Sequence, residues 1–387
     1  MAETAAGPVY VPLTVPGDRV RARLRGNRAE SFDLLEPGPA RAAPPCPHFG
    51  VCGGCTLQHV EREAYLAFKR DLVVSALAVR GLGDVPVQDC LPVPAATRRR
   101  ATFQAARAKG NTVLGFSERR SHRVTAIETC DVLVPELVEA LPALRELAEI
   151  AGPGGYHVTA TETGLDVNLL FEPEGPNPLA IPSWANRHDA ARVSALGEVL
   201  IQRRAPVVRP AGVAVAAPPG AFLQPSKEGE AALAKLVLEA LGEAAPVADL
   251  HAGLGAFTFA LARNAPVHAV EADAAALAAL AQGARHASGL KPVTTERRDL
   301  ERAPLTVKEL KRFGAVVFDP PRAGALPQAR MLAASAVPRV VAVSCNPATF
   351  ARDAAALVEG GYRLHHVSPV DQFVWSAHVE LVALFER

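Results

Sequence analysis

The C-terminal part of the chain, from about residue 211 onward, has the sequence pattern of a doubly wound α/β sheet. Short apolar, β-branched segments alternate there with Ala-rich segments of helical length. Such an alternation predicts mostly parallel strands joined by crossover helices. Seven strands are expected, at 246–250, 267–271, 293–297, 315–319, 339–345, 362–367 and 379–385. A short Pro-containing loop rather than a helix separates the last two. We therefore predict an α/β fold with a seven-stranded, Rossmann-like C-terminal domain over 211–387.

The overall composition limits what this chain can be. At 387 residues it is too long for one ordinary domain. Its 49% hydrophobic and 21% charged residues are typical of a folded soluble protein. No apolar stretch is long enough to span a membrane, and the first residues lack the basic and apolar regions of a secretion signal. We therefore expect a cytoplasmic protein with no membrane partner, and we expect it to be a monomer.

The sequence of the first 93 residues predicts two small segments. In the first, 1–44, apolar and basic residues alternate from 19 to 25, which predicts a half-exposed strand. A small β-barrel that contacts phosphates has this pattern, and so does an ordinary solvated strand. A Pro-rich connector at 36–45 leads into the second segment, 45–93, which begins with three closely spaced cysteines. A helix is predicted over 61–81 because Tyr65, Phe68, Leu72 and Leu77 recur with helical spacing.

Residues 94–210 predict a separate, mainly β or α+β domain, because short strands and turns replace the regular alternation. The formal net charge of +1 gives no general attraction to polyanions, but a local basic patch is sufficient for nucleic-acid binding. The strongest such patch outside the N-terminus consists of arginines at positions 98, 99, 100, 119, 120 and 123. We expect this domain to contact RNA.

Cys345 ends one of the predicted strands and lies directly before Asn346 and Pro347. A β-branched run closed by Asn-Pro predicts a buried strand whose last side chain reaches the rim of the sheet, where α/β sheets bind ligands. A thiol there is a candidate nucleophile, because sulfur attacks electron-poor carbon well once it is deprotonated. The alternative is a structural cysteine, since free cysteines are among the most buried residues.

A glycine-containing loop after the first strand of this sheet predicts a nucleotide-type cofactor. Asp249 precedes a Gly-x-Gly turn, and the second strand ends in Glu271, a carboxylate suited to a ribose diol. The loop lacks the third glycine of the dinucleotide fingerprint, and Asp299 follows the third strand where S-adenosylmethionine enzymes hold the adenine edge. These details favour S-adenosylmethionine over NAD, while a structural turn has the same glycines. The fourth strand ends in Asp319-Pro-Pro, which is either an ordinary turn or a further acidic group at the same rim.

Several segments together resemble the RNA uracil-5 methyltransferases that use S-adenosylmethionine, particularly the iron-sulfur branch that acts on 23S ribosomal RNA. The matching segments follow the family order and are Cys46 to His59, Cys130, Phe222 to Gln224, Asp249 to Phe257, Asp319 to Gly324, Ser344 to Pro347 and His378 to Glu380. The seven-stranded layout also fits class I methyltransferases. The resemblance implies methyl transfer from S-adenosylmethionine to C5 of a specific uridine, with 23S ribosomal RNA as the expected substrate.

The family mechanism assigns roles to three residues. Cys345 resembles the nucleophile whose thiolate adds to C6 of uracil, and Glu380 resembles the base that removes the C5 proton after methylation. Without that context, Glu380 would read as a surface carboxylate. Asp319 lies where the family contacts the methyl donor and the base, and a carboxylate facing N3–H would favour uracil over cytosine.

Cofactor contacts carry over by resemblance to the following positions: Gln224, His251, Ala256, Glu271, Asp299 and Asp319. Three residues depart from the usual family pattern. His251 stands where an aromatic residue is common, Ala256 where a small polar residue is common, and Ser226 where Asn often follows the Gln. These departures put individual contacts in question, but not the site as a whole.

Cys46, Cys52 and Cys55 provide three soft ligands in one short loop. By resemblance Cys130 is the distant fourth ligand, and the resemblance implies a [4Fe-4S] cluster. A zinc site is the alternative, although structural zinc more often uses paired Cys-x2-Cys units. Cys90 matches no motif and is expected in the packed core.

Other functions remain possible at this point. The N-terminal segment resembles the second half of the TRAM β-barrel that many relatives carry, and it is truncated here. A tRNA uracil-5 methyltransferase is one alternative, which the four cysteines disfavour. A non-catalytic iron-sulfur RNA-binding protein is another, which the presence of both Cys345 and Glu380 disfavours. An RNA cytosine-5 methyltransferase is less favoured, because such enzymes usually have a cysteine in the loop that here contains Asp319.

Overall fold

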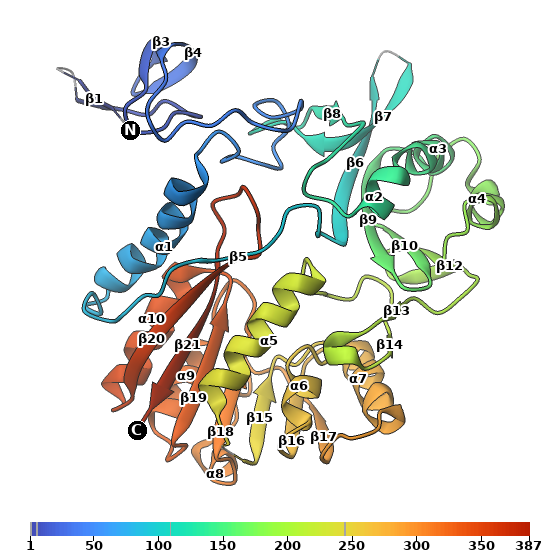
Figure 1. The fold of residues 1–387 in the computed structure, drawn as a ribbon. Coiled ribbons are helices and arrows are strands. Elements are labelled where there is room, and N and C mark those ends of the chain that lie inside the picture. The colour runs from blue at the N-terminus through green and yellow to red at the C-terminus, as the bar shows by residue number, and fades with distance from the viewer. Residues whose placement is uncertain (1, 5–6, 109, 244) are drawn as a thin grey trace.

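The computed structural model describes residues 2–4, 7–108, 110–243 and 245–387 (Figure 1). Residues 1, 5 and 6 lie outside the described residues. They belong to the N-terminal segment, for which we predict a partial barrel and no secretion signal. None of the described helices is long and apolar enough to cross a membrane.

The C-terminal region contains a sheet of eight strands, in the order β17-β16-β15-β18-β19-β21-β20-β5. Its strands are β15 Val247–Leu250, β16 Val267–Glu271, β17 Val293–Arg297, β18 Ala315–Phe318, β19 Arg339–Ser344, β20 Arg363–Asp371, β21 Glu380–Glu386 and β5 Leu91–Pro92. β15 to β19 are parallel to one another, whereas β21 is antiparallel to both β19 and β20. All seven predicted strands are present, and β20 extends four residues beyond the predicted end.

The eighth strand, β5, corrects the prediction of a seven-stranded sheet. It comes from the segment 45–93 and pairs with the end of β20 in parallel, Leu91 opposite Val370. The preceding chain already follows β20, because Gln88 N donates to Val367 O at 2.8 Å. A strand of two residues shows no periodicity in a sequence, so only the pairing with β20 reveals it.

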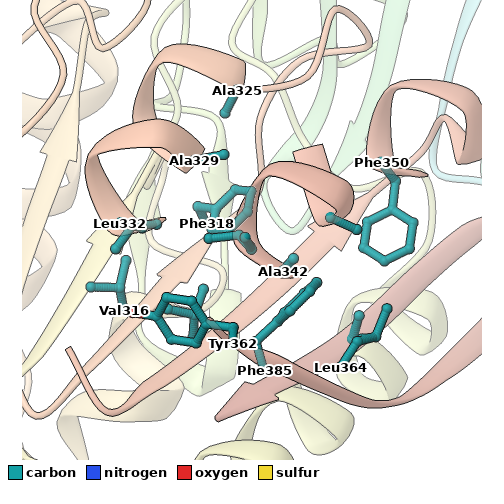
Figure 2. Close-up of a cluster of buried hydrophobic side chains, with 14 of the residues drawn as sticks. Val316, Phe318, Ala325, Ala329, Leu332, Ala342, Phe350, Tyr362, Leu364 and Phe385 are labelled. Carbon is teal, nitrogen blue, oxygen red and sulfur yellow. The ribbon is translucent and has the colours of Figure 1, made fainter. Parts of the chain in front are cut away.

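Helices cover both faces of this sheet, as Figure 1 shows. They are α5 Lys227–Leu241, α6 Thr258–Ala262, α7 Ala274–His286, α8 Val307–Leu310, α9 Leu326–Ala333 and α10 Pro347–Glu359. Successive residues of β18 alternate between two cores: Val316 and Phe318 pack on one face, and Ala315 and Val317 on the other. Figure 2 shows the first core, where Val316 and Phe318 lie near Leu332 of α9 and Phe385 of β21. Burial on both faces explains the uninterrupted apolar runs in the sequence.

Helix α1, Arg62–Ala78, follows the cysteine segment and packs against α10 and β20. The Glu61 carboxylate caps it by accepting from Glu63 N at 2.8 Å. Its buried face consists of Tyr65, Lys69, Val73 and Leu77. Phe68, which helped to predict the helix, is 40% exposed, and a lysine takes part in the buried face instead.

The central region contains a second sheet of seven strands, in the order β12-β11-β10-β9-β6-β7-β8. The strands are β6 Arg100–Ala108, β7 Asn111–Ser117, β8 Val124–Ala126, β9 Gly154–Thr161, β10 Gly164–Leu169, β11 Arg192–Ala195 and β12 Glu198–Gln202. Helices α2 Pro135–Glu139, α3 Leu141–Ala151 and α4 Ile181–Arg187 accompany them, with a separate core that includes Phe103, Leu144 and Trp184. This is an α+β arrangement.

Smaller elements complete the described chain. β13 Val207–Val208 pairs with β14 Val215–Ala216 between the two large sheets, and 3-10 turns lie at Pro178–Ala180 and Pro210–Gly212. Near the N-terminus, β1 Ala2–Thr4 pairs with β2 Gly7–Val9, and β3 Arg19–Arg25 pairs with β4 Arg28–Glu36. The predicted basic strand is therefore β3, and it belongs to a two-stranded sheet.

Candidate active site

The ends of three neighbouring strands bring three predicted residues to one edge of the eight-stranded sheet. Asp319 follows β18, Cys345 follows β19 and Glu380 opens β21. Because β18 and β19 are parallel and β21 is antiparallel, the ends of the first two meet the start of the third. We call this place the catalytic edge. The strand order thus brings together residues up to 61 positions apart, from Asp319 to Glu380.

Burial and like charges raise the pKa values at the catalytic edge. Burial raises the pKa of Asp319 to about 7, which opposes the hydrogen bond from Gln224. Burial, and then the Asp319 carboxylate, raise the pKa of Glu380 well above its usual value. Burial raises the pKa of the Cys345 thiol to about 11, with further contributions from Glu380 and Asp319, while Arg322 acts in the opposite direction. The three groups therefore influence one another electrostatically, as expected for charges held close together.

A row of amides and carboxylates connects Asp319 to Glu380. Gln224 Nε2 donates to Asp319 Oδ2 at 3.0 Å, and Gln372 Nε2 donates to Gln224 Oε1 at 2.8 Å. Gln372 Nε2 also lies 3.5 Å from Glu380 Oε1, at the limit of a hydrogen bond. Glu380 Oε2 and Gln372 Oε1 are buried without a hydrogen-bond partner among the described residues. Glu380 is thus oriented through one oxygen, and its other oxygen is available as a proton acceptor.

Gln372 is the residue of this site that the sequence analysis missed. It is 4% exposed, and its Oε1 lies beside Gly229 in the first turn of α5, where an added Cβ would come within 2.4 Å of that oxygen. A polar residue directly after a long buried strand is a signal that could have identified it. Gln372 also fixes the role of Gln224, because an amide whose oxygen accepts from Gln372 presents its NH2 group to Asp319.

The predicted cofactor residues lie at the neighbouring strand ends. Gln224, His251, Ala256 and Asp319 line a small cavity of about 40 Å³. His251 follows β15 with a φ of 63°, and its Nε2 is buried without a partner among the described residues. Burial lowers the pKa of His251, against the attraction of Glu271 and Asp299, so those two carboxylates lie close enough to act on the imidazole. All six predicted positions are therefore brought to one side of the sheet edge.

Glu271 is held firmly at the end of β16. Its Oε2 accepts from Gly253 N at 2.9 Å, and its Oε1 accepts from Ala272 N at 2.7 Å and Asp273 N at 2.8 Å. These bonds tie the carboxylate to the glycine-containing loop after β15. Each carboxylate oxygen has more than one acceptor site, so a ribose hydroxyl can still donate to it.

Asp249 differs from Glu271 because it contacts a helix. It is 0% exposed, and Thr258 Oγ1 donates to its Oδ2 at 2.5 Å. Burial raises the pKa of Asp249 to about 7, although the Thr258 hydrogen bond opposes this shift. Because the contact reaches the first residue of α6, Asp249 fixes the loop to that helix.

A second cavity, of about 310 Å³, is lined by Cys46, Cys52, Cys55 and Cys130. We call it the cysteine cavity. Gly53 N donates to Ser117 O at 2.9 Å, which attaches the loop of the first three cysteines to the end of β7. Burial raises the pKa of Cys55 to about 12, and the other three cysteines add to this shift, so the four sulfur atoms lie within electrostatic reach of one another.

The four cysteine side chains reach this cavity from two segments of the chain. Among the described residues, no three His, Cys, Asp or Glu side chains are grouped closely enough to hold one metal ion. Cys90 lies elsewhere, 5% exposed in the core that Figure 2 shows in part, as predicted.

Comparison with known proteins identifies the family. A sequence model of the tRNA (Uracil-5-)-methyltransferase family matches residues 211–387. The chain is 35% identical over 415 residues to the 23S rRNA (uracil(1939)-C(5))-methyltransferase RlmD of Chromohalobacter salexigens, with 98% of this chain and 84% of the relative covered. This chain belongs to the RNA uracil-5-methyltransferase family. It is also 47% identical over 387 residues to an uncharacterized RNA methyltransferase of Brucella suis, covering 98% of this chain and 93% of that one.

A solved structure shows the same fold over nearly the whole enzyme. The tRNA (uracil-54, C5)-methyltransferase of Pyrococcus abyssi, in complex with S-adenosyl-L-homocysteine, gives a TM-score of 0.75 at 26% identity, covering 98% of this chain and 95% of that one. The enzyme is therefore an RNA uracil-5-methyltransferase that uses S-adenosylmethionine, as the sequence predicted. Its substrate class is RNA.

Proposed function

We propose that the enzyme methylates C5 of a uridine through a covalent bond between Cys345 and C6. The observation that supports this is the meeting of a half-buried thiol, Asp319 and a buried Glu380 at the catalytic edge. C5 of uracil is a weak nucleophile. Addition of a thiolate to C6 converts the ring to an enolate, whose C5 attacks the methyl group on the donor sulfonium.

Each step leaves atoms and electrons in balance. The Cys345 thiol gives its proton to water before it attacks, and Arg322 favours the thiolate. Methyl transfer releases S-adenosylhomocysteine. Glu380 then takes the C5 proton, and the electron pair of that C–H bond restores the C5–C6 double bond as the thiolate leaves C6. Because its pKa is raised, the Glu380 carboxylate is a stronger base than an ordinary glutamate.

The methyl donor is proposed to bind along the row of strand ends from β15 to β18, through the six positions named above as cofactor contacts. Glu271 would receive a ribose hydroxyl, and Asp319 would lie between donor and uracil. The His251 Nε2, buried without a partner among the described residues, marks a place where a bound group can complete a hydrogen bond.

We further propose that the cysteine cavity holds a [4Fe-4S] cluster with Cys46, Cys52, Cys55 and Cys130 as ligands. The cluster would supply a fixed covalent crosslink between the cysteine loop and the central region. About four irons and four sulfides per chain after anaerobic purification would support this assignment, as a cluster held by cysteine thiolates requires. Stoichiometric zinc without sulfide would contradict it.

For the substrate, we propose 23S ribosomal RNA. The support is the 35% identity to a 23S rRNA methyltransferase together with the four-cysteine set. A tRNA substrate is the second candidate, because the similar solved structure is that of a tRNA methyltransferase. Methylation of the two RNAs by the purified enzyme, followed by mass-spectrometric mapping of 5-methyluridine, separates the candidates and gives the position.

The roles of the four segments of the chain are also a proposal. Residues 211–387 would catalyse, 94–210 would hold RNA and supply Cys130, 45–93 would supply the other cluster ligands, and 1–44 would be a TRAM-like segment. The exposed arginines of β3 support the last assignment, because such a strand can neutralise phosphates. Removing residues 1–44 would test it by weakening RNA binding without removing any catalytic residue.

The covalent route has a direct test. Glu380→Gln removes the base but leaves Cys345 and the donor site, so methylated RNA should remain covalently attached to the enzyme and migrate with it on a denaturing gel. Cys345→Ala should form no adduct. An enzyme that methylates RNA while neither it nor Glu380→Gln ever forms an adduct would rule the route out.

A further inference from the structure

Lys69 is fully buried, with 0% exposure, on the inner face of α1. Its Nζ donates to a carboxylate oxygen of Asp371, to Phe373 O at 2.9 Å and to His378 O at 2.6 Å. An ammonium group has three N–H donors, and here each has an acceptor. A buried charge is costly unless it is paired in this way, so the contacts define one position for the side chain.

The three acceptors of Lys69 lie at the two ends of one loop. We call residues 372–379, between β20 and β21, the β20–β21 loop. Asp371 and Phe373 flank Gln372 at its start, and His378 lies two residues before Glu380 at its end. Lys69 therefore joins the start and the end of the loop across its base. Gln372 lies directly between two of these anchors, and Glu380 lies two residues after the third.

The tip of the same loop is held by the cysteine segment. Trp375 O accepts from Thr56 N at 2.8 Å and Leu57 N at 3.0 Å, directly after Cys55. Trp375 N donates to Tyr65 Oη at 2.7 Å, and Tyr65 Oη donates to Asp371 Oδ1 at 2.7 Å. Trp375 has a φ of 57°, a conformation that only local contacts such as these would keep. Val374 and Ser376 of the loop line the cysteine cavity.

We propose that Lys69 is a positioning residue for the reaction, which clamps the β20–β21 loop so that Gln372 and Glu380 face Asp319 and Cys345. Lys69 touches neither substrate nor cofactor in this proposal, and it acts through the loop. The last step, removal of the C5 proton by Glu380, depends most on this clamp. Addition of Cys345 and methyl transfer depend on β18, β19 and the donor site, which Lys69 reaches only indirectly, through Gln372 and Gln224. The proposal rests on the proposed covalent function.

The test uses the full-length enzyme, S-adenosylmethionine and 23S ribosomal RNA transcribed in vitro with tritium at C5 of its uridines. Tritium release measures proton removal, and a denaturing gel measures the covalent adduct. Lys69→Met keeps the length of the side chain but removes the clamp. Tritium release should fall about 100-fold, the cost of misplacing a catalytic group by roughly 1 Å, while methylated adduct accumulates as in Glu380→Gln.

A purely structural role predicts a different result. In that case adduct formation and tritium release would fall together, in proportion to the folded fraction. Arg192→Met is the matched control, because Arg192 is also buried and pairs with a buried carboxylate, Asp166, at 2.7 Å in the other sheet. Arg192→Met should lower the folded fraction without changing the ratio of adduct to released tritium.

Tyr65→Phe provides a second variant in case Lys69→Met does not fold. It removes both bonds of the Tyr65 hydroxyl and leaves the charge pair intact, so the same accumulation of adduct is expected, with release slowed roughly 10-fold. A folded Lys69→Met or Tyr65→Phe enzyme with an unchanged ratio would overturn the role of Lys69. If Glu380→Gln itself forms no adduct, the covalent function fails first, which is a separate outcome.

Discussion

The catalytic edge and the cysteine cavity are built in different ways. At the catalytic edge, Asp319, Cys345 and Glu380 extend from the ends of adjacent strands whose backbones are paired on both sides. At the cysteine cavity, three cysteines lie on a loop and the fourth comes from a turn 75 residues beyond Cys55. The difference teaches that strand pairing holds the backbone of the reacting groups, while the cysteine cavity depends on the contacts between its two segments. The two sites should therefore respond differently to substitution.

The largest expected effect is at the catalytic edge. Cys345→Ser keeps the size of the side chain but replaces the thiol by a hydroxyl, which forms an anion far less readily. Methyl transfer to RNA should fall by at least about 10⁴-fold, as is typical when a nucleophile is removed. The unfolding temperature should stay within about 2 °C of the parent enzyme, because Cys345 belongs to neither large core. Residual transfer above 1% would contradict its role.

The matched change at the cysteine cavity should act on stability first. Cys130→Ser removes the ligand that joins the central region to the cysteine loop, so a bound cluster should be lost with its brown colour and its iron. The unfolding temperature should fall by several degrees. Methyl transfer should decline only in proportion to the loss of folded enzyme. Calorimetry and iron analysis on the same preparation measure both effects. An unchanged iron content would remove Cys130 from the ligand set.

A smaller effect is expected at Gly229. Replacement by Ala favours the helix by up to about 1 kcal/mol, but the new Cβ would lie 2.4 Å from Gln372 Oε1 and would displace that side chain. We expect kcat to fall roughly 10-fold with little change in KM, because the displaced amide orients Glu380 and Gln224. In a Gln372→Ala background the same Gly229→Ala change should cost almost nothing. Additive losses would show that Gly229 acts elsewhere.

The smallest effect concerns the reactivity of Cys345 before substrate binds. Because its pKa is about 11, alkylation by iodoacetamide should accelerate steadily from pH 7 to 10 without a plateau. Glu380→Gln removes a negative charge that raises this pKa, so the thiolate should form at lower pH and alkylation at pH 8 should be several-fold faster. Measurement requires the other cysteines to be followed separately by peptide mass spectrometry.

Much of the catalytic edge was predictable because strand ends can be read from a sequence. Apolar runs closed by Asp319-Pro-Pro and Cys345-Asn-Pro locate two of the ends, and parallel order brings them to one edge. β5 was missed because two residues carry no periodicity. Lys69 was missed because lysine in a helix normally indicates a solvent-facing position, and its acceptors lie more than 300 residues away.

The sequence by itself determined the class of fold, the seven strands and the family, and it named the candidate residues for methyl transfer, because these follow from local patterns of polarity and from motifs. The tertiary structure decided which groups act together. It showed that Gln372 links the donor side to Glu380, and that Lys69 and the cysteine segment hold the same loop. Such pairings depend on distances between segments far apart in the chain, which no local pattern specifies.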